Sequence, residues 1–381
     1  MRILFLVYHG FSDYSGISKK IHYQVKGLRE NGHDVHLCYY GFAENGHRCR
    51  FIDDYLLKDY GTGRIAALRQ RIDYRCIYDY CIREKIEFIY ARSFMNASPW
   101  LVNLFKKLRL SGIHAVTEIP TYPYDSEFSP HIWKQPLRFV IDKWFRHRLY
   151  QYMDAMVTFS DAEQIFGQRT IKISNGVDID SIPLHKSMCP SINAPLHLIG
   201  VAEVHIWHGY DRLIAGLGEY YVKNQNPRQI FFHIVGGVHP HYMYRTNQFH
   251  QGLQAIIDKY KIQEYIIFHG QKFGKELDDV FDISCFAIGS LGRHRSGITV
   301  IKTLKNREYA TRGIPFIYSE QDSDFDNQQY ILKAPANESP IDIQKIIDFV
   351  DSFTLSPVDI RKTVEHLTWK NQMKQVIDAL F

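Results

Sequence analysis

The chain lacks the features that mark several common protein classes. Its six cysteines (38, 49, 76, 81, 189 and 285) form no C-x-x-C pair and no metal-ligand spacing. Reduced thiols of this kind are typical of cytosolic proteins. No run approaches the roughly 18 continuous apolar residues of a transmembrane helix, and the opening "MRILFLVYHGF" is too short for a secretory signal. We therefore expect a cytoplasmic protein.

Charge of one sign is also scarce. The formal net charge is +5, and the whole excess lies in residues 1–185, which hold 25 Lys and Arg against 20 Asp and Glu. This is too mild for a dedicated nucleic-acid binder. The segment 131–150, "HIWKQPLRFVIDKWFRHRLY", joins five basic residues to five aromatic ones. We expect peripheral contact with an anionic membrane at its inner face, and a solvated amphipathic helix is the alternative.

The order of apolar runs predicts two α/β domains, which a chain of 381 residues favours. "RILFLVY" has the composition of a parallel strand covered on both faces. A Gly/Ser loop and a helical segment ending at Gly32 follow it. The pattern restarts at 196 with "LHLIGVAEV". Residues 182–195 lack periodicity and are interpreted as a linker. We predict doubly wound domains at 1–181 and 196–363, with ligands at the carboxyl ends of the strands.

The segment 302–318, "KTLKNREYATRGIPFIY", carries the strongest chemical signal. Thr303 is a candidate N-cap, which puts Lys305 in the first helical turn and Glu308 one turn later. A helix N-terminus binds phosphate, and Lys305 adds a full charge there. Glu308 could accept hydrogen bonds from a ribose diol. A plain surface ion pair between Lys305 and Glu308 is the alternative.

The chain resembles the retaining nucleotide-sugar glycosyltransferases of the GT-B architecture, of the family 4 or group 1 type, in the branch that makes bacterial surface polysaccharides. Five segments carry the resemblance in order: "SGIS" with "ENGHDV", "KISNGVDID" (172–180), "VAEVHIWHGYDRLI" (201–214), "HIVGG" (233–237) and "LKNREYATRGIPFI" (304–317). It implies two Rossmann-like domains facing across a cleft. It also implies that the last helix, within 364–381, packs back on the first domain.

The resemblance also assigns donor-binding residues. In the family, the second of two glutamates eight positions apart binds the donor ribose, and Glu308 matches it. The first glutamate falls at Val300, so this sequence departs there. The segment "RHRSGI" (293–298) could supply the contacts to sugar and diphosphate instead, through Arg293, Arg295 and backbone at Gly297.

A second departure concerns the diphosphate. The family carries an Arg and a Lys five positions apart, where this sequence has Glu203 and His208. His208 can hold phosphate only when protonated. Either the charge comes from Lys305, Arg293 and Arg295, or transferase activity has been lost.

Candidates in the first domain lie at two places. Gly16 would let the donor phosphate approach the backbone and Lys19 could reach it, although a tight turn explains the glycine equally well. Glu118 follows a strand and could stabilise positive charge or take the acceptor proton, or it merely caps a turn. The residues expected to be exposed with it on the acceptor side are Tyr122, Tyr124 and Asp125.

Together these features predict a hexosyltransferase with a UDP- or GDP-linked sugar as substrate. The acceptor would be a glycan or lipid-linked glycan, as in capsule or O-antigen synthesis. Catalytic roles are expected for Glu118, His208 and Lys305, with no cofactor. The pairs "DID" (178–180) and H-x-H (239–241) lack further ligands, so no metal is expected. The alternatives are a catalytically inactive GT-B partner subunit and a nucleotide-sugar epimerase.

Overall fold

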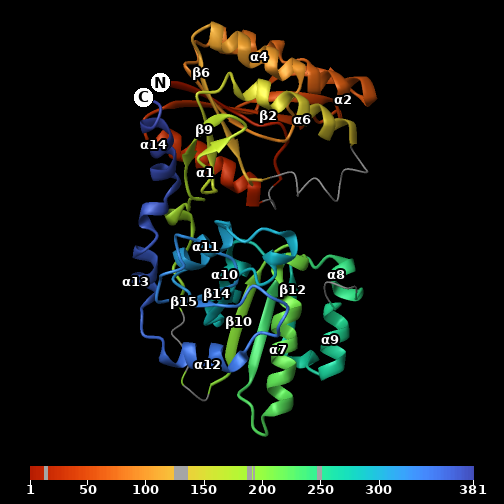
Figure 1. Cartoon of the computed structure of the whole chain (residues 1–381), viewed down its shortest axis with the longest axis vertical. Coiled ribbons are helices and arrows are strands. Elements are labelled where there is room, and N and C mark those ends of the chain that lie inside the picture. Colours follow the sequence, from red (N-terminus) through yellow and green to blue (C-terminus); the bar gives the residue numbers. More distant parts are fainter. Residues whose placement is uncertain (13–15, 124–135, 187–190, 192–193, 247–250) are drawn as a thin grey trace. The chain divides into compact units, whose positions relative to one another are not determined.

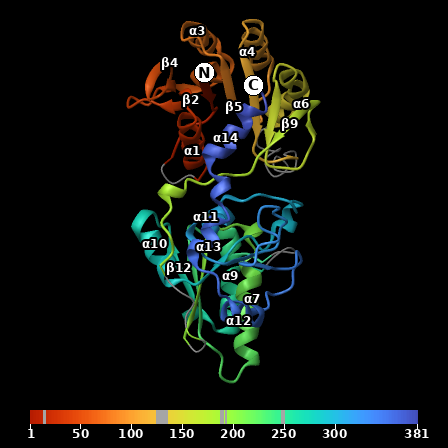
Figure 2. The same cartoon turned by 90° about the vertical axis from the view of Figure 1, so that its left-hand side faces the viewer.

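The computed structural model describes all residues except 13–15, 124–135, 187–190, 192–193 and 247–250. The chain forms two compact units (Figures 1 and 2). Unit 1 comprises Met1–Gly176 with Leu367–Phe381, and unit 2 comprises Val177–His366. The domains predicted from the sequence were 1–181 and 196–363, with the last helix, within 364–381, packed on the first domain.

Unit 1 is built on a nine-stranded sheet in the order β4-β3-β2-β1-β5-β6-β7-β9-β8. Its central strands are parallel and strongly apolar, and every residue of β5 is buried, as expected for a sheet covered on both faces. The strands are β1 (Arg2–Leu6), β2 (Asp34–Phe42), β3 (Arg48–Ile52), β4 (Tyr55–Gly61), β5 (Phe88–Arg92), β6 (His114–Ile119), β7 (Ala155–Thr158), β8 (Gln164–Ile165) and β9 (Gln168–Lys172).

The helices of unit 1 connect these strands, except for α14, which is the last element of the chain. They are α1 (Gly16–Glu30), α2 (Gly63–Ile72), α3 (Arg75–Arg83), α4 (Pro99–Leu110), α6 (Pro136–Tyr150) and α14 (Trp369–Asp378). No helix among the described residues is both long and apolar enough to cross a membrane. The five cysteines in the described part of the chain are free thiols.

The antiparallel hairpin β3–β4 at one edge of this sheet was not predicted. Its two strands are joined by Asp53 and Asp54, whose φ angles are 46° and 70°. A two-residue hairpin turn with positive φ at both positions is of type I′, for which Asn-Gly or Asp-Gly is the usual sequence signal. The Asp-Asp pair gave no such signal.

Unit 2 contains a parallel six-stranded sheet in the order β12-β11-β10-β13-β14-β15. This is the doubly wound order in which the winding direction reverses between the first and fourth strands, here β10 and β13. The strands are β10 (Leu196–Val201), β11 (Ile230–Val235), β12 (Ile266–Gly270), β13 (Phe286–Ile288), β14 (Phe316–Tyr318) and β15 (Ile331–Lys333).

The helices of unit 2 surround this sheet. The α-helices are α7 (Tyr210–Lys223), α8 (Pro240–Tyr244), α9 (Leu253–Tyr260), α10 (Gly274–Ile283), α11 (Leu304–Arg312), α12 (Ile343–Ser352) and α13 (Pro357–Lys362). Two 3₁₀ helices, η3 (Ile206–His208) and η5 (Arg293–Ser296), lie beyond the carboxyl ends of β10 and β13.

The segment interpreted as a linker is partly bound to unit 2. The backbone N–H of His185 donates to the Arg312 carbonyl at 2.8 Å, and Lys186 forms an ion pair with Asp282 at 2.8 Å. The described part of this segment is irregular backbone bonded to unit 2, which explains its lack of periodicity.

The C-terminal helix α14 lies against α1 within unit 1 (Figures 1 and 2). Trp369 is 2% exposed. A Cβ at Gly27 would come within 2.7 Å of the Trp369 backbone, and one at Gly176 within 2.5 Å of its ring. The glycines are therefore required for the close packing of this indole.

We predict that Trp369→Ala lowers the free energy of unfolding by about 3–5 kcal/mol, because truncating a buried indole leaves a cavity. Urea unfolding followed by circular dichroism measures the change. The matched control is Trp144→Ala on α6, whose side chain is 76% exposed and should change stability by less than about 0.5 kcal/mol. Equal effects of the two substitutions would contradict the packing described.

Candidate functional site

The switch point of unit 2 gathers several polar side chains. In an open α/β sheet, ligands bind outside the carboxyl ends of the strands where the winding reverses. Here β10 leads into η3 with His208, and β13 leads through η5 with Arg293 to helix α11 with Lys305. These three residues come from separate parts of the sequence. The Leu291 N–H donates to the His208 carbonyl at 2.9 Å, which joins η3 to the segment before η5, and Lys305 and Arg293 both act on the pKa of His208.

Lys305 lies in the first turn of α11, as predicted. The Thr303 hydroxyl caps the helix by accepting from the Asn306 N–H. The Lys305 Nζ is buried and has no hydrogen-bond partner among the described residues. Burial, together with the charge of Arg293, lowers the Lys305 pKa to about 7. Glu320 acts on this pKa in the opposite direction. A buried ammonium that makes no hydrogen bond is costly, so this position favours an anionic ligand.

Arg293 supplies the second positive charge. Its guanidinium carbon lies 5.8 Å from the centre of the Trp207 ring. The charge also acts on His208, whose pKa is well below its usual value because of burial, Lys305 and Arg293. Lys305 and Arg293 therefore create positive potential at the end of β13.

His208 is neutral in this setting. Its Nδ1 accepts the backbone N–H of His205 at 2.9 Å, so the ring proton is on Nε2. A protonated His208 was predicted to hold phosphate by charge. Its burial favours the neutral form, so this role is not supported. It can still donate one hydrogen bond. Glu203, the other departure from the family pattern, has a side chain that is 81% exposed.

Glu320 also belongs to this cluster, and the sequence analysis missed it. It is the second residue after β14 and is 2% exposed. Both carboxylate oxygens are buried without a hydrogen-bond partner in the described part of the chain. Burial raises its pKa to about 7, while its own backbone N–H, Arg293 and Lys305 act in the opposite direction. Glu118 was chosen as a candidate because it follows a predicted strand. The same criterion applies to Glu320.

Glu308 does not pair with Lys305. It forms an ion pair with Arg312 at 3.1 Å, and Arg312 also bonds Asp278 at 2.7 Å. The surface-pair alternative for Lys305 and Glu308 is therefore wrong. The Glu308 side chain remains 33% exposed, and its ribose role stays a prediction.

The Arg295 side chain is buried and paired with residues of the protein itself. Its side chain is 2% exposed and pairs with Asp211 at 2.8 Å and Glu338 at 2.5 Å. It also donates to the Ile206 carbonyl at 2.8 Å. A ligand could bind this guanidinium only by replacing these partners. Gly297 ends η5 with φ of 68° and open space where a Cβ would be.

Glu118 contradicts the expectation of an exposed acceptor-side carboxylate, because it is fully buried. Lys20 Nζ lies 3.1 Å and Arg92 Nε 3.2 Å from its Oε1, and Gln24 and Tyr90 donate to Oε2 at 2.5 and 2.7 Å. These partners outweigh burial and lower the Glu118 pKa to about 2. The group is a paired core carboxylate, and its satisfied oxygens do not fit the catalytic role.

The other first-domain candidates are only partly described. Gly16 begins α1, with open space at its Cβ position, and Lys19 is exposed on the same helix. Tyr122 is half-buried, with its ring 5.9 Å from that of Phe166. Tyr124 and Asp125 lie outside the described residues. In the described ranges, no group of three or more His, Cys, Asp or Glu is placed to hold a metal ion.

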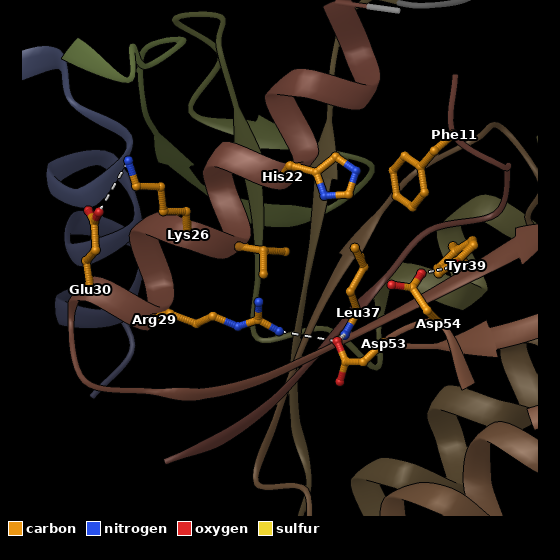
Figure 3. Close-up of a pocket in the computed structure, with 10 residues that line it drawn as sticks. Phe11, His22, Lys26, Arg29, Glu30, Leu37, Tyr39, Asp53 and Asp54 are labelled. Carbon is orange, nitrogen blue, oxygen red and sulfur yellow. Dashed lines mark hydrogen bonds and ion pairs between the residues drawn. The ribbon is translucent and has the colours of Figure 1, made fainter. Parts of the chain in front are cut away.

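Unit 1 also contains a pocket of about 580 Å³ between α1 and strand β2 (Figure 3). Its charged side chains face one another: Arg29 pairs with Asp53 at 3.2 Å, and the Tyr39 hydroxyl donates to Asp54 at 2.6 Å. None of the predicted site residues lines it.

No protein-family model matches the sequence, and no curated protein matches it. Solved structures match nearly the whole chain. The catalytic domain of starch synthase IV from Arabidopsis thaliana, bound to ADP and acarbose, is 10% identical, with 99% of this chain and 98% of that chain covered and a TM-score of 0.59.

Two further structures match equally widely. The trehalose-6-phosphate structure from E. coli bound with UDP-2-fluoro glucose is 11% identical over 100% and 99% of the two chains, with a TM-score of 0.55. An α,α-trehalose-phosphate synthase (UDP-forming) from Burkholderia xenovorans, in complex with glucose-6-phosphate, is 10% identical over 100% and 99%, with a TM-score of 0.53. The predicted fold class is thereby confirmed: the chain has the GT-B fold with Rossmann-like α/β domains.

We predict that Glu118→Gln destabilises the protein by about 3–5 kcal/mol, because Lys20 and Arg92 would keep buried charge without a counter-ion. The stabilisation is present above the ordinary pKa of 4.5 and is lost as pH falls through about 2. The gap between wild type and variant should therefore narrow across that range in urea unfolding. The control is Glu163→Gln, whose side chain is 85% exposed; a gap no larger than the control's would contradict the network.

Proposed function

We propose that the protein is a glycosyltransferase that moves a hexose from a nucleotide-sugar to a glycan or lipid-linked glycan acceptor, with retention of anomeric configuration. The observation that carries the proposal is the buried, unpartnered Lys305 Nζ in the first turn of α11. A helix N-terminus and two cations at a switch point favour a diphosphate. The GT-B fold adds support, since its similar structures include one bound to ADP and one bound with UDP-2-fluoro glucose.

The proposed reaction replaces one bond at the anomeric carbon of the sugar by another. The bond from that carbon to the diphosphate oxygen breaks, and a bond to the acceptor hydroxyl oxygen forms. Lys305, Arg293 and the free N–H groups of α11 stabilise the charge that grows on the leaving diphosphate. The hydroxyl proton passes to a phosphate oxygen of the leaving group, so the step needs no carboxylate base and no metal.

The identities of donor and acceptor are proposals of the same kind. We propose a UDP- or GDP-linked hexose, and surface-polysaccharide synthesis such as capsule or O-antigen as the setting. On the acceptor side Tyr122 remains a candidate, with Tyr124 and Asp125, while Glu118 is withdrawn because of its burial.

Peripheral membrane contact is proposed for helix α6. Leu137, Val140 and Trp144 lie three and four residues apart and are 72%, 50% and 76% exposed, and Lys143 and Arg148 are exposed on the same helix. An apolar row flanked by basic residues fits an anionic lipid surface. A cytoplasmic protein bound at the inner face of the membrane would meet such a surface.

Two basic residues of this segment have structural contacts instead. Arg146 is 7% exposed, with its guanidinium 4.4 Å from the centre of the Phe166 ring. Arg138 donates to the Met95 carbonyl at 3.3 Å. Neither is suitable for a test of lipid binding.

Replacing Lys305 tests the donor site. Lys305→Met should lower the affinity for UDP, GDP or ADP, whichever the wild type binds, by about 10- to 100-fold. This corresponds to about 1.5–3 kcal/mol, the range for hydrogen bonds to a charged group. The bare nucleoside should bind unchanged. Since the substitution removes a buried unpaired charge, the melting temperature should not fall. Isothermal titration calorimetry and thermal unfolding measure these effects.

Lys275→Met on α10 is the matched control, because that lysine is exposed. Unchanged affinity in Lys305→Met would mean that the donor site lies elsewhere. Nucleotide binding without hydrolysis or transfer would favour the inactive-partner alternative. An epimerised nucleotide-sugar as product would favour the epimerase.

The membrane contact is tested by Lys143→Glu, Trp144→Ser and Arg148→Glu combined. At low salt the wild type should sediment with vesicles rich in phosphatidylglycerol. The variant should stay in the supernatant, because both its apolar and its basic contacts with the vesicle are removed. Lys106→Glu with Lys275→Glu changes the net charge by the same amount at other exposed sites and should not abolish binding. A wild type that ignores such vesicles would end this part of the proposal.

A further inference from the structure

Glu320 differs from the other fully buried carboxylates of the fold. Glu118 has four partners in unit 1. Asp322, two residues after Glu320, is bonded by Arg307 at 2.5 and 3.0 Å. Glu320 is equally inaccessible, yet both of its oxygens lack a hydrogen-bond donor within the described residues. A buried acceptor in this state is stabilised only by a molecule that brings donors.

Backbone pairing places Glu320 beside the position where the resemblance expects a glutamate and finds valine. The Gln321 N–H donates to the Thr299 carbonyl at 2.7 Å, and the Ile301 N–H donates to the Gln321 carbonyl at 3.0 Å. Val300 and Gln321 therefore form a parallel bridge. Val300 is 42% exposed and Glu320 is 2% exposed, so the buried carboxyl of this pair of segments belongs to Glu320.

The charges around Glu320 define the kind of group that it can bind. Arg293 on η5 and Lys305 on α11 act on it as cations, and Asp322 acts as an anion on its own segment. Lys333 on β15 donates to its backbone carbonyl, not to the carboxylate. A carboxyl group exchanges hydrogen bonds with hydroxyl groups and, when ionised, repels phosphate. The cations can therefore hold a diphosphate while Glu320 holds the hydroxyls attached next to it.

We infer that Glu320 binds the hydroxyl groups of a sugar ring directly adjoining the diphosphate and supplies the carboxylate that position 300 lacks. The inference rests on the proposed function and deepens it, because it adds a residue that selects the ligand. A nucleotide-sugar has such rings on both sides of its diphosphate: the ribose and the transferred hexose. The shared chemistry is a polyol beside a diphosphate, and the ligands chosen for the test separate the two rings.

The test uses three probes of increasing size on the full chain: pyrophosphate, UDP and UDP-glucose, with the GDP and ADP series in parallel. Calorimetry gives the dissociation constants for wild type, Glu320→Gln and Glu320→Ala. Pyrophosphate affinity should not fall in either variant, because both keep the basic groups and lose a carboxylate that repels phosphate. The variants should lose about tenfold in affinity, which corresponds to about 1.4 kcal/mol, for the first probe of the series that contains the ring bound by Glu320. Loss on going to UDP identifies ribose, and loss only with UDP-glucose identifies the hexose.

Thermal unfolding separates this role from a structural one. Removal of an unpaired buried carboxyl should leave the melting temperature of Glu320→Gln equal to or above that of wild type. Glu219→Gln on α7, where the glutamate pairs with Lys223, is the control for the substitution type. A lower melting temperature with unchanged affinity ratios would overturn the inference and leave the donor site standing. A wild type that binds none of the seven probes would refute the proposed function and the inference together.

Discussion

An amino group that is held away from water and makes no hydrogen bond within the described residues is the constraint that organises the proposed site. Lys305 has this state because α11 begins at the switch point of unit 2, with Arg293 nearby. Folding alone would favour a paired or exposed lysine there, since an unpaired buried charge is costly. The fold bears this cost at the place where a doubly wound sheet binds ligands. The geometry of the free protein is thus complementary to an anion.

Unit 1 shows what the same chemistry looks like when it serves stability. Glu118 lies at the end of a parallel strand, like Glu320, but Lys20, Arg92, Gln24 and Tyr90 all reach it. Its pKa falls to about 2, whereas that of Glu320 rises to about 7. Strand position alone therefore does not distinguish a structural carboxylate from a ligand-binding one. The difference is the number of donors that converge from other elements.

This difference explains which features could be predicted from the sequence. Parallel strands were recognisable because their apolar runs are nearly continuous, and Lys305 because Thr303 marks the start of its helix. The partners of Glu118 come from α1 and β5, so their convergence depends on tertiary structure that a linear pattern does not contain. Whether Glu308 pairs with a residue three positions before it or four positions after it also depends on such packing. The Asp53-Asp54 hairpin was missed because local turn preferences are weak.

Glu203 and His208, which replace the basic pair of the family pattern, leave the loop after β10 without positive charge. His208 is neutral, with Nδ1 already accepting a backbone hydrogen bond, and Glu203 is exposed. The loop after β10 therefore contributes no net positive charge to a diphosphate. The basic groups are Arg293 and Lys305, from η5 and α11 on the other side of the switch point, with the Glu320 carboxyl in electrostatic interaction with both. Because electrostatic stabilisation depends on where charge lies and not on which loop carries it, the loss of a basic pair after β10 is not by itself a loss of the capacity to bind and stabilise a leaving diphosphate.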